Sequence, residues 1–176
     1  SRKGSLDISA DLIMLANTPM IVVCAGAKAI LDLAATVEYL ETACVPVVGY
    51  QTDDFPAFYT RKSGLKTAAR ANSPEEVARL ARAHWALGQR SAVLVVLPPP
   101  EEYAMPQADV EEAVRKALAE AQEQGIRGQT VTPFLLERVN QQTHGVSMAA
   151  NLALLKNNAR LAGEIAGAMA APPAAG

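Results

Sequence analysis

A lysine follows directly on an apolar run that is typical of a buried strand. Residues 21–28 read Ile-Val-Val-Cys-Ala-Gly-Ala-Lys, so β-branched side chains give way to small ones and then to Lys28. In open α/β sheets, ligand and catalytic groups gather at the carboxyl ends of the strands. A partly desolvated lysine has a lowered pKa and attacks a carbonyl carbon as the free amine. The pattern indicates a Schiff-base nucleophile, although composition alone favours a surface lysine just past a strand.

Two carboxylates and a hydroxyl precede this lysine. Residues 7–11 read Asp-Ile-Ser-Ala-Asp. Asp7 and Asp11 could share a hard cation or act as acid and base. Ser9 between them is a small donor suited to a phosphate or sugar oxygen. The alternative is that Asp11 caps a helix and Asp7 is solvated, and the residues alone leave both open.

Three asparagines interrupt an apolar segment near the carboxyl end. Asn151, Asn157 and Asn158 are expected to form an amide-rich face of a helix, although asparagine is a poor helix former. An amide offers a donor and an acceptor together, so it could read the edge of a nucleobase. Capping or helix–helix hydrogen bonding explains the asparagines equally well.

The two histidines carry no metal-ligand spacing. His84 lies beside Trp85 in an expected helix, where a structural role is predicted. His144 precedes a glycine at a helix end, where it would interact with the helix dipole. No Ser-His-Asp, zinc, Walker or dinucleotide-binding pattern is present.

Composition indicates a cytoplasmic globular protein. The chain has 176 residues, half of them apolar, and a formal net charge of −2, so neither a nucleic-acid partner nor a membrane is expected. Its two cysteines, Cys24 and Cys44, lie in apolar segments and are predicted to be buried, reduced thiols. No apolar run reaches the roughly 18–20 residues that a bilayer requires.

Strands and helices alternate along the chain. This alternation predicts an α/β fold, a layered α/β/α domain with a largely parallel (mixed) sheet. The segment 51–71 is expected to be a long loop with one short strand at most, and loops of this length are usually functional. Strands are predicted over 20–24, 45–50 and 91–97. Helices are predicted over 11–17, 29–42, 73–87, 108–124, 134–143 and 147–169, with an Ala/Pro-rich disordered tail at 171–176.

Several words of the sequence resemble the pseudouridine-5′-phosphate glycosidase family. The match runs in order from about residue 6 to residue 170, so residues 1–170 are expected to form the carboxyl-terminal portion of such a domain. The words are Asp-Ile-Ser-Ala-Asp-Leu at 7–12, Val-Val-Cys-Ala-Gly-Ala-Lys at 22–28, Glu-Tyr-Leu-Glu-Thr at 38–42, Gly-Tyr-Gln-Thr at 49–52, Phe-Pro-Ala-Phe at 55–58, Thr-Pro-Phe-Leu-Leu at 132–136 and Asn-Asn-Ala-Arg-Leu-Ala at 157–162.

The resemblance implies an enzyme that reversibly cleaves the C–C glycosidic bond of pseudouridine 5′-phosphate to uracil and ribose 5-phosphate. It implies a divalent metal, typically manganese, and a homotrimer. Lys28 would be the covalent nucleophile, and Asp7 the metal-linked residue. Ser9, Ala10 and Asp11 would contact substrate, as would Asn151, and Asp11 is the candidate for proton handling.

The chain departs from the family pattern in three places. The family's amino-terminal half, which supplies a glutamate acid and a second lysine, is absent, so a complementing amino-terminal half is a further expected partner. His-Arg-Gly before the aspartate word is replaced by Ser-Arg-Lys-Gly-Ser at 1–5. The family's Asn-Pro-x-Pro-Glu-Glu after a strand reads Leu-Pro-Pro-Pro-Glu-Glu at 97–102, so an amide near the pocket is replaced by the apolar Leu97. The alternative function is a non-catalytic half-domain that binds a sugar phosphate or an assembly partner. An unrelated Schiff-base aldolase is disfavoured because eight βα units are lacking.

Overall fold

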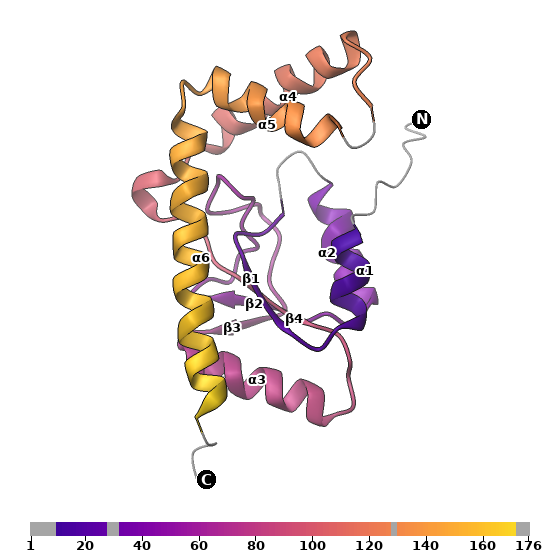
Figure 1. The fold of residues 1–176 in the computed structure, drawn as a ribbon, viewed down its shortest axis with the longest axis vertical. Coiled ribbons are helices and arrows are strands. Elements are labelled where there is room, and N and C mark those ends of the chain that lie inside the picture. The colour runs from indigo at the N-terminus through magenta and orange to yellow at the C-terminus, as the bar shows by residue number, and fades with distance from the viewer. Residues whose placement is uncertain (1–9, 28–31, 128–129, 172–176) are drawn as a thin grey trace.

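The computed structural model describes residues 10–27, 32–127 and 130–171 (Figure 1). Within these ranges the chain alternates between strands and helices, as the sequence predicts. The strands are β1 (Ile21–Cys24), β2 (Val47–Tyr50), β3 (Ala69–Ala71) and β4 (Val93–Val96). The helices are α1 (Ala10–Asn17), α2 (Leu33–Thr42), α3 (Pro74–Ala86), the 3₁₀ helix η1 (Glu101–Tyr103), α4 (Gln107–Glu123), α5 (Val131–Gln142) and α6 (Val146–Ala170).

The four described strands form one sheet in the order β1-β4-β2-β3, and every pairing is parallel. The predicted parallel sheet is therefore confirmed. The short strand within the expected loop is β3. Because β4 lies between β1 and β2, strands that are distant in sequence become neighbours: Ile21 pairs with Val93, and Val47 pairs with Leu94.

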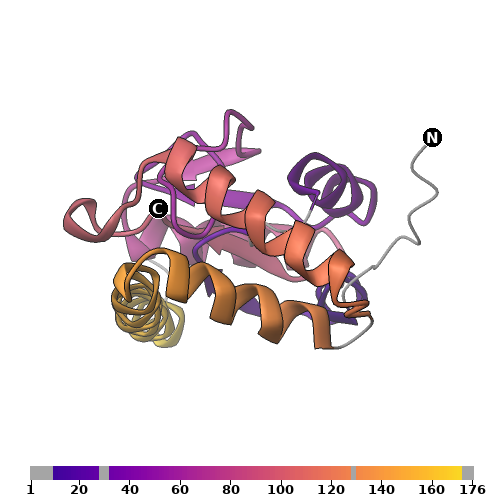
Figure 2. The same ribbon diagram turned by 90° about the horizontal axis from the view of Figure 1, so that it is seen from above.

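Alternate side chains of the strands pack into two separate layers of helices. Val93 and Val95 face α3 and the second half of α6, whereas Leu94 and Val96 face α1 and α2. This alternation is what a strand period of two residues dictates. The predicted α/β/α layering is confirmed, and Figures 1 and 2 show α1 and α2 on the opposite side of the sheet from α6.

A third apolar cluster lies between α4, α5 and the start of α6, at one end of the molecule (Figure 1). Leu135 and Val139 of α5 pack there against Val110 and Ala117 of α4, all nearly or fully buried. Tyr59 and Met105 join this cluster to the body of the domain. The α4–α5 pair thus has its own core beside the sheet.

The predicted start of α3 at Ser73 is confirmed in atomic detail. Ser73 is the N-cap, its side chain accepts a hydrogen bond from the Glu76 amide at 3.3 Å, and Pro74 is the first helical residue. In α2, Asp32 is the N-cap, so the helix begins at Leu33; the earlier predicted start at Ala29 lies outside the described residues. The 3₁₀ helix η1 was not predicted.

Candidate active site at the end of strand β1

The turn after β1 is held by a backbone contact that admits no side chain. Gly26 has φ of +82°, and a Cβ built on it would lie 1.8 Å from the carbonyl oxygen of Pro56. Gly26 also forms an antiparallel bridge with Ala57. A glycine is therefore required here on two grounds, the left-handed backbone and the close approach.

The loop that meets this turn is itself buried. The Phe58 amide donates to the Ala25 carbonyl at 3.1 Å, and the Leu97 amide donates to the Cys24 carbonyl at 3.0 Å. Phe55 and Ala57 are 1% and 6% exposed. The peptide that leads to Lys28 is thus fixed from two sides, by the loop and by β4. Functional groups are held most precisely where the backbone is fixed in this way.

Cys24, the last residue of β1, is not a reactive thiolate. Burial raises the pKa of its thiol to about 11, and a hydrogen bond with the backbone of Gly26 opposes this shift only partly. The thiol is therefore neutral near pH 7, and the sequence-based prediction of a reduced cysteine is compatible with this environment. Cys44 is exposed, so the prediction that both cysteines are buried is wrong for that residue.

A polar cluster joins the 55–60 loop to the turn between α5 and α6. Tyr59 is 6% exposed. Burial raises the pKa of its hydroxyl, and a hydrogen bond with Ser147 opposes the shift. Ser147 in turn donates to Asn140 at 3.4 Å. No role was predicted from the sequence for Tyr59 or Ser147, and neither residue lies in one of the sequence words that carry the family resemblance.

The six predicted site residues divide into two sets. Lys28, Asp7 and Ser9 lie outside the described residues. Ala10 and Asp11 are the first two residues of α1. Asp11 is exposed and lies in the first turn, not at the cap position, where a carboxylate interacts favourably with the helix dipole. Asn151 lies in the second turn of α6 and is half-buried.

Asn151 and Asn158 occupy the inward face of α6. They are seven residues apart, and the buried Leu154 and Leu161 lie on the same face. The Oδ1 atom of Asn158 is buried without a hydrogen-bond partner in the described part of the chain. Asn157 lies on another face and accepts a hydrogen bond from Arg160 at 3.1 Å. The interpretation of a single amide-rich face is therefore wrong for Asn157.

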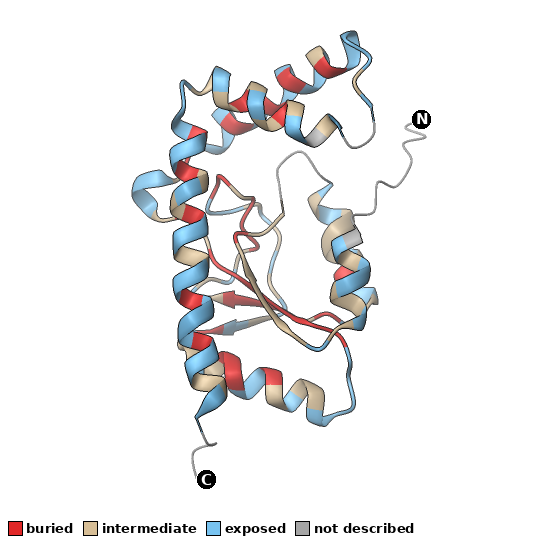
Figure 3. Cartoon of the chain, in the orientation of Figure 1, coloured by how far each residue is buried: buried red, intermediate tan, exposed pale blue. Residues whose placement is uncertain are grey.

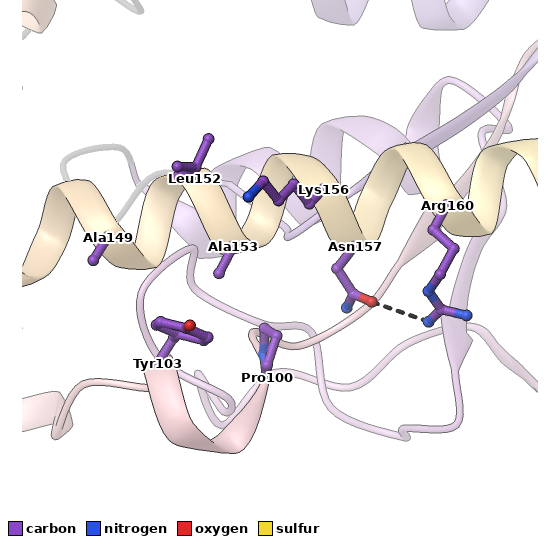
Figure 4. A pocket seen from close by; sticks show the side chains of 8 residues that line it. All are labelled: Pro100, Tyr103, Ala149, Leu152, Ala153, Lys156, Asn157 and Arg160. Carbon is purple, nitrogen blue, oxygen red and sulfur yellow. Dashed lines mark hydrogen bonds between the residues drawn. The ribbon is translucent and has the colours of Figure 1, made fainter.

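A groove of about 400 Å³ runs between η1 and α6 (Figure 4). Tyr103 and Pro100 form one wall, and Ala149 and Ala153 face them from the helix. Asn157 and Arg160 close the groove at one end. Its lining is mostly apolar, and the Arg160 guanidinium is engaged by Glu164 at 2.7 Å, so the groove is not a ready-made anion site.

His84 has a structural role, which its hydrogen bonds show. His84 Nε2 lies 2.8 Å from Ser91 Oγ, and the Ser91 hydroxyl donates to the Cys44 carbonyl. Trp85 donates to the Ser91 carbonyl at 3.0 Å. This network ties α3 to the amino end of β4, the edge opposite to the candidate site, and confirms the structural role predicted for His84.

No group of three or more His, Cys, Asp or Glu residues capable of holding a metal occurs in the described ranges. The residue expected to be linked to the metal, Asp7, lies outside them. Across those same ranges, no helix is both long and apolar enough to cross a membrane.

Two solved structures share this fold. The prealnumycin C-glycosynthase AlnA, determined in complex with ribulose 5-phosphate, superposes with a TM-score of 0.86 at 41% identity, over 93% of this chain and 54% of that one. An indigoidine synthase A-like protein from Thermotoga maritima superposes with a TM-score of 0.83 at 39% identity, over 92% of this chain and 53% of that one.

Curated relatives are closer in sequence. The pseudouridine-5′-phosphate glycosidase of Gemmatimonas aurantiaca is 56% identical over 168 residues, 96% of this chain and 55% of the relative. That of Caldanaerobacter subterraneus subsp. tengcongensis is 53% identical over 162 residues, 92% of this chain and 53% of the relative. The chain thus spans about half the length of the curated relatives it matches, and the resemblance read from its sequence words is confirmed. Residues 1–168 match the family described as indigoidine synthase A like protein, and the chain belongs to that family.

Proposed function

We propose that this chain carries the nucleophile-bearing part of a pseudouridine-5′-phosphate glycosidase. The observation that supports this most directly is its 53–56% identity to curated relatives of that name over more than nine-tenths of its length. The solved C-glycosynthase relative also binds a pentulose phosphate, ribulose 5-phosphate. The names glycosidase of pseudouridine 5′-phosphate and C-glycosynthase both refer to a bond between a carbon atom of a ring and the sugar.

The chemistry that fits these residues uses Lys28 as the covalent nucleophile. A C-glycoside has no heteroatom leaving group to protonate, so the acid-assisted departure used on O-glycosides does not apply. The neutral amine of Lys28 attacks C1′ and forms a C–N bond, while the C1′–O4′ bond breaks, the ribose ring opens and O4′ takes up the proton that the amine loses. The C1′–C5 bond to uracil then breaks as C5 takes up a proton, and the nitrogen lone pair becomes the second bond of an iminium. Water hydrolyses the iminium to ribose 5-phosphate and free Lys28.

In this proposal the other predicted residues bind substrate or move protons. Asp11 handles the proton that the amine must lose before it attacks. Ser9, Ala10 and Asn151 contact the substrate. The rigid turn at Gly26 supports the role of Lys28, because a nucleophile works best from a fixed position. The neutral Cys24 thiol, with its pKa near 11, does not compete as a nucleophile.

Asp7 is the one residue of this chain that the proposal links to a divalent metal. A bound manganese ion would organise phosphate and sugar oxygens. The described residues supply no ligand cluster for it, so no step above is assigned to the metal. Assembly as a homotrimer is likewise proposed by resemblance to the family.

Borohydride trapping tests this function. The chain, with and without a complementing amino-terminal half, is incubated with ribose 5-phosphate and sodium borohydride, then digested for mass spectrometry. We expect a reduced sugar-phosphate adduct on Lys28, which is lost in Lys28→Arg. The matched control Lys62→Arg alters an exposed lysine of the 51–68 loop and should leave the labelling unchanged.

A label on another lysine, or no label even with the complementing half present, contradicts the proposal. Binding of ribose 5-phosphate without adduct formation would instead identify the non-catalytic half-domain. The observation that favours this second function, binding without catalysis, is that the chain spans only about half the length of its curated relatives.

A further inference from the structure

The turn at residues 57–60 has a strained backbone beside the candidate site. Ala57 and Thr60 exchange both of their backbone hydrogen bonds, at 3.2 and 3.3 Å. Between them Phe58 has φ of +60°, a left-handed conformation that a bulky residue rarely adopts. Such strain persists only where the surroundings over-determine it, and it clusters at functional sites. The turn is therefore a candidate for a functional role, which its contacts specify.

One side of the turn is attached to the end of β1. The Phe58 amide donates to the Ala25 carbonyl at 3.1 Å, and Ala57 forms the antiparallel bridge with Gly26. These contacts join backbone to backbone, so they do not depend on side-chain rotamers. The 57–60 turn thus has a fixed position relative to the Gly26 turn.

Tyr59 attaches the other side of the turn to the start of α6. Its carbonyl accepts a hydrogen bond from the Met105 amide at 2.9 Å, and its ring centroid lies 4.7 Å from that of Phe58 in an edge-on contact. The backbone and the ring of Tyr59 are therefore held without its hydroxyl group. The hydroxyl forms a hydrogen bond with Ser147, which is 1% exposed in the first turn of α6.

Ser147 is the residue at which α5, the 57–60 turn and α6 meet. Its amide donates to Thr143 Oγ1 at 3.3 Å, and its hydroxyl donates to Asn140 Oδ1 at 3.4 Å. The N-cap of α6 is Gly145, which has no side chain to accept from the first amides of the helix. The polar contacts of Ser147 thus hold the start of α6 where a capping side chain is lacking.

Asn151 follows Ser147 by one helical turn, on the same face of α6. Figure 3 shows the buried stripe of this helix, to which Ser147 and Leu154 belong, and Asn151 is half-buried beside it. Helices transmit displacements as rigid elements. A shift or rotation of the first turn of α6 therefore moves the Asn151 amide with it.

We propose that the Tyr59 hydroxyl is a positioning group for the proposed reaction: through Ser147 it sets where Asn151 lies relative to the turn at the end of β1. Asn151 is the amide that the proposed function assigns to substrate binding, so this inference rests on that function. Tyr59 itself touches neither the substrate nor the reacting atoms in this assignment. Its hydroxyl governs substrate affinity, whereas the Gly26 turn is held by contacts that do not involve it.

The test measures the rate of borohydride-trapped adduct formation on Lys28 over a range of ribose 5-phosphate concentrations, with the complementing half present. Tyr59→Phe removes the hydroxyl and keeps the ring in its apolar cluster. We expect the half-saturating concentration to rise roughly fivefold, the usual effect of one hydrogen bond, while the rate at saturation changes less than about twofold. A purely structural effect would instead lower the fraction of labelled protein and the melting temperature.

Three further variants show the route of the effect. Ser147→Ala removes the same hydrogen bond from the other partner and should reproduce the change. In the Asn151→Ala background, Tyr59→Phe should have no additional effect, because residues that act through one another are not additive. Tyr39→Phe is the matched control: it removes the hydroxyl of a half-buried tyrosine on α2 and should leave the half-saturating concentration unchanged.

A second measurement needs no reaction. In NMR spectra of the chain without sugar, the side-chain amide signals of Asn151 should shift in Tyr59→Phe and in Ser147→Ala, and should stay in place in Tyr39→Phe. The absence of any label on Lys28 contradicts the proposed function, and the NMR signals then decide separately whether Tyr59 positions Asn151.

Three outcomes overturn the positioning role. One is a half-saturating concentration that Tyr59→Phe raises no more than Tyr39→Phe does. Another is an effect of Tyr59→Phe that persists at full size in the Asn151→Ala background. The third is a set of Asn151 amide signals that neither Tyr59→Phe nor Ser147→Ala moves.

Discussion

At the scale of single residues, the approach of Gly26 to Pro56 is the contact that defines the candidate site. The Gly26 turn is short, left-handed and pressed against a backbone carbonyl, so its shape does not depend on a movable side chain. The rigidity of the site thus comes from the backbone.

Gly26→Ala is expected to destabilise the chain by roughly 3 kcal/mol or more, because the added Cβ meets Pro56 in addition to the strain of positive φ. Gly64→Ala is the matched control. Gly64 has φ of +83°, but its Cβ would have nothing within 4 Å, so only the strain of about 1–2 kcal/mol remains. Urea unfolding of both variants measures the difference. Equal losses would show that the Pro56 contact is relieved at little cost.

The sequence could indicate Lys28 as a nucleophile but not the neighbours of its turn. The small residues 25–27 after a β-branched run signalled a strand end, and that end is where the structure has it. The contact with Pro56 joins segments thirty residues apart, and no periodicity encodes such a pairing. Tyr59 and Ser147 were missed for the same reason.

At the scale of elements, Arg82 ties the end of α6 to α3. Its guanidinium donates to the carbonyls of Met169 and Ala171, each at 2.9 Å, and to that of Ala168 at 3.3 Å. The last carbonyls of a helix lack partners within the helix, and a cation there also interacts favourably with the helix dipole. A single side chain thereby terminates a helix that lies more than eighty residues away in the sequence.

Arg82→Ala is expected to lower the free energy of unfolding by about 1–3 kcal/mol, since three carbonyls lose a charged donor. Hydrogen exchange should increase in the last turn of α6 before it does elsewhere. Arg79→Ala, an exposed arginine of the same helix α3, should change stability by less than about 0.5 kcal/mol. If the two variants behave alike, the Arg82 contacts do not stabilise the helix end.

Helices and strands whose ends are marked by neighbouring residues in the sequence were predicted well, and those that depend on contacts with distant segments were not. The Ser73–Pro74 start of α3 was found because a cap and a first-position proline are encoded by adjacent residues. The three-residue strand β3 was expected only as one short strand at most, because its pairing with β2 is created by the sheet and not by its own sequence. The boundaries of β2 and β4 were placed one to two residues too wide, since apolar residues continue past the ladder.

At the scale of the whole molecule, the described chain contains three apolar clusters and not one. Two of them sandwich the sheet, and the third joins α4, α5 and the start of α6. In proteins with separate apolar clusters, each cluster can unfold locally with its own free energy of opening.

Leu135→Ala is expected to remove about 2–5 kcal/mol from the α4–α5 cluster, because Leu135 is 1% exposed and a cavity would remain. Amide exchange should accelerate across α4 and α5 more than across β4. Leu161→Ala, a fully buried leucine over the sheet, should give the reverse pattern. Uniform acceleration in both variants would mean that the chain unfolds as a single unit.

The pairing of Ile21 with Val93 has a consequence for biosynthesis. β1 emerges from the ribosome before its hydrogen-bonding neighbour β4, and β2, β3 and α3 are translated between them. An uncharged, β-branched segment therefore lacks its β4 partner while residues 25–92 are translated, and distant pairings of this kind fold slowly. The nascent chain is most vulnerable to aggregation in that interval, and a slower ribosome lengthens it.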